Sequence, residues 1–157
     1  MSTMSGITRG MLAAAVAALV FALAGCADMG TSGAGKVTLS GSQEVPPVTT
    51  AASGSGTIMV NVDKSVSGSV TTTGVAATAA HIHTGAPGQN GPVIIPLAKT
   101  GDGTWSVAAG AKLTDAQYES YKAGNLYVNV HSAANKGGEV RGQLKPSPVP
   151  TPPSGGY

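Results

Sequence analysis

Apolar and polar residues alternate along eight short segments of this chain, which are separated by residues that favour turns. Such alternation is typical of a β-strand that buries one face and exposes the other. The segments predicted as strands are 36–40, 57–62, 66–72, 79–84, 93–97, 104–107, 125–132 and 139–144. Because the apolar positions recur at every second residue, we expect the inward faces of these strands to form one shared core.

Two of these strands carry a clear apolar face, and a tight turn predicts one hairpin. The side chains expected to point into the core from these two strands are Ile58, Val60, Val62, Val93, Ile95 and Leu97. The turn is formed by 63–65, between the second and third strands. The segment 41–55, which contains two adjacent prolines, is interpreted as a long loop.

A single stretch, 113–122, has the residues of a helix instead. Thr114 is a suitable N-cap, Asp115 complements the helix dipole, and Gly124 stands just beyond the expected end. Eight evenly spaced strands with one short helix predict an all-β fold, either an antiparallel sandwich or a barrel. Of the two, we expect a Greek-key β-sandwich.

The first 25 residues have the features of a signal peptide. Arg9 precedes an apolar run over 11–24, which is too short to span a bilayer comfortably. The run ends in small residues before Cys26 and resembles the bacterial lipobox, which implies lipidation of that cysteine. The alternative is an ordinary cleaved signal peptide with an incidental cysteine.

A lipid on Cys26 places the domain in a bacterial cell envelope, with the membrane as a partner only through this anchor. By resemblance to lipoprotein sorting, Ala27 in place of an aspartate indicates the outer membrane, with the domain facing the periplasm. Residues 26–35 are interpreted as a flexible tether, 36–144 as the folded domain, and 145–157 as a disordered Pro-rich tail.

Composition and charge exclude several classes of function. Charged residues make up only 10% of the chain, and the formal net charge is +2, which gives no basis for binding nucleic acid. Cys26 is the only cysteine, so the domain has neither a disulfide nor a thiolate metal ligand. A blue-copper site, which requires a cysteine ligand, is therefore excluded.

The three histidines of the chain all lie on predicted strands, opposite the apolar faces. His81 and His83 are two residues apart, so both imidazoles point to one face, about 7 Å apart at the backbone. His131 lies on the polar face of the strand 125–132. If the two strands are neighbours, three imidazoles converge, and this set of ligands suits copper or zinc. The alternative is that the histidines are ordinary strand residues bonded to backbone or solvent.

An additional ligand for such a metal is expected from Glu139, from Met59 or from water. Packing is the commoner role of a methionine on a strand, so Met59 has that alternative role. Because neutral imidazole is the ligand, metal binding is expected to weaken as the pH falls through about 6.5.

Six segments together resemble the CHRD domain, which is named from chordin and also occurs in bacterial proteins. They are 40–47, 80–85, 91–93, 113–114, 124–132 and 138–144, and they follow in order through nearly all of 36–144. Most members of this family have no assigned biochemical role, so the resemblance bears on the fold more than on the function.

The strand that carries His81 and His83 is also similar in layout to the copper strand of copper/zinc superoxide dismutases, another Greek-key sandwich. This similarity implies copper ligands at these two histidines and, more loosely, at His131. It also implies an anion contact at Arg141, for which a surface ion pair is the alternative. The bridging histidine, the zinc ligands and the disulfide of those enzymes have no counterpart here.

Three functions remain open at this point. The first is a lipid-anchored domain that binds a transition metal, copper ahead of zinc, in metal handling or as a redox accessory. The second is a noncatalytic module that binds another envelope protein, and the third is a redox enzyme similar to superoxide dismutase. An enzyme is less favoured, because the chain has no Gly-x-Ser-x-Gly elbow and no phosphate-binding loop.

Overall fold

The computed structural model describes residues 35–146, and the structural account below concerns this part of the chain. The predicted signal peptide, Cys26, most of the tether and most of the Pro-rich tail lie outside the described residues. The elements are β1 (Lys36–Ser40), the 3-10 helix η1 (Gly41–Gln43), β2 (Ser53–Val60), β3 (Val66–Thr73), β4 (Ala77–Thr84), β5 (Val93–Gly101), β6 (Thr104–Val107), α1 (Asp115–Lys122), β7 (Leu126–Ser132) and β8 (Val140–Gln143).

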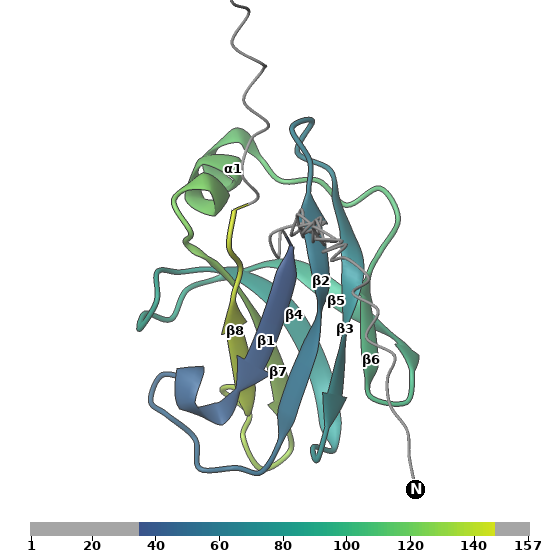
Figure 1. Cartoon of the computed structure of the whole chain (residues 1–157), viewed down its shortest axis with the longest axis vertical. Helices are drawn as coiled ribbons and strands as arrows, with labels where there is room; N and C mark the ends of the chain where they lie inside the picture. The colour runs from purple at the N-terminus through teal and green to yellow at the C-terminus, as the bar shows by residue number, and fades with distance from the viewer. Residues whose placement is uncertain (1–34, 147–157) are drawn as a thin grey trace, which may run out of the picture.

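The eight strands form one antiparallel sheet that closes into a barrel (Figure 1). Their order around the barrel is β1-β2-β3-β6-β5-β4-β7-β8. β4, β5 and β6 pair in sequence and β3 lies beside β6, which is a Greek-key connection. β1 closes the ring, because it pairs with β2 on one side and with β8, through Ser40 and Arg141, on the other.

The all-β class, the antiparallel strands and the single helix are confirmed, but the expected sandwich is wrong. A sandwich has two stacked sheets, whereas here one sheet closes on itself. The alternation of apolar and polar residues is the same in both architectures. The difference depends on whether the first and last strands pair, and alternation along each strand does not encode that pairing.

The interior of the barrel is filled by aliphatic side chains together with Trp105. Ile58, Val60, Ile95 and Leu97 are buried there, as the alternation predicts. Two members of the expected inner faces are exposed instead. The exposed fraction of Val62 is 80%, because β2 ends at Val60, and that of Val93 is 49%, because the β4–β5 register shifts next to it.

The predicted hairpin and helix are both present. β2 and β3 pair antiparallel across the turn, where Lys64 adopts a positive φ of 67°. α1 begins after Thr114, whose hydroxyl accepts from the Gln117 backbone N–H while the Gln117 amide oxygen accepts from the Thr114 N–H. This capping box satisfies two N–H groups that the first turn leaves unpaired. Figure 1 shows α1 at one end of the barrel.

Within 35–146, no helix combines the length and the apolar character that crossing a bilayer requires.

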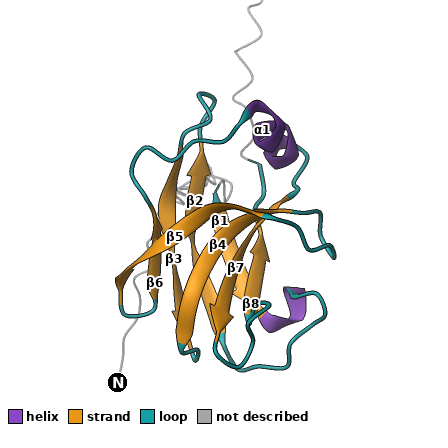
Figure 2. Ribbon diagram, turned by 180° about the vertical axis from the view of Figure 1, so that it is seen from behind, coloured by secondary structure: helices purple, strands orange, loops and turns teal. Residues whose placement is uncertain are grey.

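Two loops cover the outer face of β4, β7 and β8, which the sequence pattern leaves exposed. One is the β1–β2 loop, which carries η1 and lies beside β8 in Figure 2, and the other is the β4–β5 loop. The Asn90 side chain joins the two loops by donating to the Val45 carbonyl oxygen at 2.7 Å. The outward side chains of Tyr127, Asn129 and Arg141 are buried as a result, so polar groups are enclosed outside the barrel core.

Candidate metal centre

The three histidines come together on the outer face of β4 and β7. These strands are direct neighbours, with Ala79 opposite His131 and His81 opposite Asn129 in the register. One potential ligand atom from each of His81, His83 and His131 lies within 4.8 Å of the others. The predicted convergence is thus confirmed, and within the described residues this is the only group of three or more His, Cys, Asp or Glu side chains placed to hold a metal ion.

Backbone carbonyl groups orient two of the three imidazoles. The Nδ1 atom of His83 lies 2.9 Å from the Gly91 carbonyl oxygen, and that of His131 lies 2.9 Å from the Lys136 carbonyl oxygen. A carbonyl oxygen can only accept, so each Nδ1 carries the proton and each neutral ring keeps its lone pair on Nε2. Metal-binding histidines are typically oriented in this way, by an N–H that donates to a carbonyl group.

Of these two lone pairs, that of His83 has no donor, and that of His131 has only another histidine as its donor. His83 Nε2 is buried and has no hydrogen-bond partner in the described part of the chain. His131 Nε2 lies 3.0 Å from His81 Nδ1, which therefore donates to it when no metal is bound. A cation bound between the three rings replaces the proton that His81 Nδ1 donates to His131. It also gives the lone pair of His83 Nε2 a partner. The donor set therefore fits a metal of the imidazole-binding type.

The spacing of the three nitrogens can be compared with that around an ion. Nitrogens bound at about 2.0–2.1 Å in tetrahedral geometry lie roughly 3.3 Å apart. The His81 and His131 nitrogens are already 3.0 Å apart, and the full set lies within 4.8 Å. Binding of one ion by all three rings would bring the more distant nitrogens closer than 4.8 Å. Because His81 and His131 are only partly buried, a fourth position remains open toward solvent.

The environment favours the neutral form of His81 and His83. Burial is the main cause that lowers the pKa of His81, and the neighbouring His131 and His83 lower it further. Burial also lowers the pKa of His83, although the hydrogen bond to Gly91 partly opposes this effect. The lone pairs are therefore available at a pH at which an ordinary histidine is partly protonated.

Tyr127 and Arg141 form a stack behind His83 that the sequence analysis missed. The Tyr127 ring lies parallel to the His83 ring, with 4.8 Å between the ring centres and 10° between the planes. The Arg141 guanidinium carbon lies over the Tyr127 ring, 3.5 Å from the ring centre. The tyrosine hydroxyl oxygen also accepts from the Gly91 N–H at 3.1 Å, so Tyr127 and Gly91 together fix the His83 ring. The only sequence signal was that Tyr127 shares a strand face with His131.

The other residues predicted for the site lie apart from the three nitrogens. Glu139 accepts a hydrogen bond from the Thr50 hydroxyl at 2.8 Å and is not part of the metal-binding group. Met59 lies on β2, which pairs with β1 and β3 and not with β4 or β7. The surface ion pair considered for Arg141 is wrong, because this side chain is 1% exposed and donates to Ala86, Asn90 and Gln143 instead.

A second buried charge, Glu44, lies on the loop that covers this face. One of its carboxylate oxygens accepts from the Asn129 amide at 3.3 Å, and the other, Oε1, is buried with no partner among the described residues. Burial raises the pKa of Glu44 to about 7, although Arg141 and the Asn129 hydrogen bond act in the opposite direction. Sequence reasoning missed this residue, because nothing in the chain shows that its loop folds back onto the sheet.

The raised pKa of Glu44 predicts a loss of stability at alkaline pH. Its folded-state pKa of about 7 lies above the ordinary value of 4.5. The stability that the protonated carboxyl group contributes is therefore fully present below pH 4.5 and is lost as the pH rises through 7. Glu44→Gln keeps an acceptor for Asn129 and cannot ionise. We expect this variant to exceed the wild type by about 2–3 kcal/mol in free energy of unfolding at pH 8, with little difference at pH 4.5. Urea unfolding at both pH values measures this, and an equal difference at the two values would contradict it.

One of three comparisons with known proteins gave a match. The CHRD domain family matches residues 36–144, the same range that the strand pattern delimits as the folded domain. Comparison with curated proteins gave no match, and comparison with solved structures gave none. Because the family match extends over well more than half of the sequence, the chain belongs to the CHRD domain family.

Proposed function

We propose that this domain binds a transition metal, copper ahead of zinc, through His81, His83 and His131. Its role is metal handling, or that of a redox accessory, at a bacterial cell envelope. The observation that carries the proposal is the buried Nε2 atom of His83, which has no hydrogen-bond partner in the described chain and lies beside the paired nitrogens of His81 and His131.

A buried polar atom without a partner costs free energy, and a native structure usually retains such an atom for a reason. The lone pair of His83 lies close to nitrogen atoms of two other imidazoles. A bound cation is the simplest partner that all three can share. Copper is placed ahead of zinc because, among the divalent first-row metals, a given nitrogen site binds copper most tightly. The open fourth position allows a water molecule or a small ligand on the metal.

Isothermal titration of the purified full-length protein in detergent with Cu(I), Cu(II) and Zn(II) tests the site. We expect one ion per chain, with copper bound more tightly than zinc. Mg(II), which prefers oxygen ligands, serves as the control and is expected not to bind. Unchanged copper binding in a variant with all three histidines replaced by alanine would exclude the site.

The location of this function follows from the proposed lipid anchor on Cys26, which is supported by the lipobox-like sequence before it. We expect the wild-type protein to appear in the membrane fraction of bacterial cells and to incorporate labelled palmitate. Cys26→Ala is expected to move it to the soluble fraction and to remove the label. A protein that stays on the membrane after this change would contradict the anchor.

A further inference from the structure

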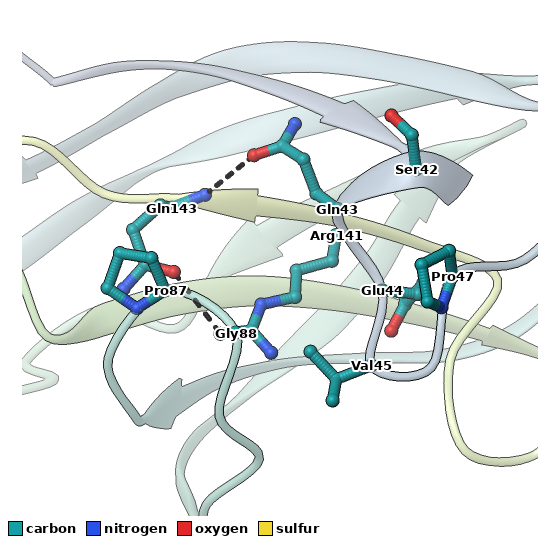
Figure 3. A pocket seen from close by; sticks show the side chains of 9 residues that line it. All are labelled: Ser42, Gln43, Glu44, Val45, Pro47, Pro87, Gly88, Arg141 and Gln143. Carbon is teal, nitrogen blue, oxygen red and sulfur yellow. Dashed lines mark hydrogen bonds between the residues drawn. The ribbon is translucent and has the colours of Figure 1, made fainter.

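A pocket of about 420 Å³ lies between the two loops that cover the outer face, on the side of Arg141 (Figure 3). Val45, Pro47 and Pro87 supply apolar walls, and Glu44, Arg141 and Gln143 supply polar groups. This volume lies in the range of sites for small organic molecules, and apolar walls with a few polar groups are typical of such sites.

Most polar side chains around the pocket already have partners within the protein. The Gln143 amide nitrogen donates to Gly85 and Gly124, and its oxygen accepts from Arg141. Glu44 is the exception, because its Oε1 atom is buried, faces no donor of the described chain and belongs to a side chain that is only 4% exposed. This atom is an acceptor that needs a donor from outside the described chain.

Arg141 supplies the opposite charge without making an ion pair. The acceptors of its guanidinium group are neutral oxygens of Ala86, Asn90 and Gln143, and its flat face covers Tyr127. Within residues 35–146, no carboxylate lies within ion-pair distance of it, although the charge of Glu44 acts on it through space. At pH 8, where Glu44 is ionised, the pocket therefore holds a buried positive and a buried negative group that do not touch.

We propose that this pocket binds an uncharged amide group with an aliphatic substituent, whose N–H donates to Glu44 Oε1 and whose carbonyl oxygen lies on the side of Arg141. A ligand that is only anionic meets the repulsion of Glu44, and one that is only cationic meets that of Arg141. A neutral amide presents both a donor and an acceptor, and its aliphatic part packs against Val45 and the two prolines. The inference is independent of the metal, because the pocket residues include none of the three histidines.

The probe is N-acetyl-L-valinamide, observed by saturation-transfer difference NMR with the full-length protein in detergent and a metal chelator. A ligand of this size is expected to bind with a Kd of roughly 1 mM. N-acetyl-L-valine, which carries a carboxylate in place of the amide, is expected to bind at least tenfold more weakly at pH 8. A blocked tripeptide, acetyl-Gly-Val-Gly-amide, distinguishes the two possible sources of the amide group. Tighter binding of the tripeptide than of the valinamide indicates a protein segment, and equal binding indicates a small amide.

Two variants test the geometry of the pocket. Glu44→Gln is expected to weaken binding of the valinamide at least fivefold, whereas Glu119→Gln, on the exposed face of α1, is expected to leave it unchanged. Val45→Phe fills the pocket, and Val45 accepts from Asn90 only through its backbone carbonyl oxygen, which the substitution keeps. This variant is therefore expected to abolish binding in a folded protein. Absence of saturable binding, equal binding of the carboxylate, or an unaltered Kd in Glu44→Gln would each overturn the proposal.

Discussion

Replacing His83 with alanine is expected to weaken Cu(II) binding by roughly 100-fold or more, since loss even of a residue that only orients a ligand costs 10–100-fold. His83 contributes the one ligand atom that is fully enclosed and already oriented, through its bond to Gly91 at 2.9 Å. Competition titration against a chelator of known affinity measures the change. In the wild type, burial lowers the pKa values of His81 and His83, so we expect acid to weaken metal binding at a lower pH than it would with ordinary histidine ligands.

Lys136→Ala is the matched control for this experiment. Lys136 lies beside the site and is exposed, but it contributes only its backbone carbonyl oxygen, which orients His131. The substitution removes a side chain near the three histidines and leaves the imidazoles and their backbone hydrogen bonds in place. A loss of affinity in Lys136→Ala as large as that in His83→Ala would contradict the proposed roles.

Replacing Ile82 with alanine is expected to lower the free energy of unfolding by about 3 kcal/mol, the usual cost of a large-to-small change in a packed core. Ile82 is 1% exposed and pairs with Ile95 and Val128 inside the barrel. It also separates His81 from His83 in the sequence. Urea unfolding measures the loss, and the same variant is expected to bind metal less tightly, since β4 is then held less firmly.

Val62→Ala is the control for the core substitution. Its side chain is 80% exposed, so we expect a change in free energy of unfolding of less than about 0.5 kcal/mol. If Ile82→Ala cost no more than Val62→Ala, the inward orientation of Ile82 would be excluded. The outward orientation of His81 and His83, which follows from it, would then be excluded too.

The cluster of three histidines could be predicted from the sequence because it depends on local alternation. His81 and His83 share one face of β4, and His131 lies on the matching face of β7. The single further condition is that the two strands are neighbours, and seven register pairs show that they are. Alternation also predicts the inward orientation of Ile82 and Val128, which the structure confirms.

Features that depend on contacts between distant segments could not be predicted. Closure of the barrel depends on the pairing of β1 with β8, which neither strand encodes alone. Burial of Glu44 and Arg141 depends on how two loops fold over the sheet, and loop conformation leaves no periodic signal. The exposure of Val93 results from a register shift beside His83, which changes the face of one residue without any change in the alternating pattern.

The closing contact of the barrel has a consequence for its thermal fluctuations. β1 and β8 share a single register pair, Ser40 with Arg141, whereas β4 and β7 share seven. Transient opening of the ring is therefore expected first along the boundary between β1 and β8, where few backbone amides resist exchange with solvent. The three imidazoles lie on β4 and β7, which share many more register pairs than β1 and β8 do, so their arrangement is expected to survive an opening of the ring at that boundary.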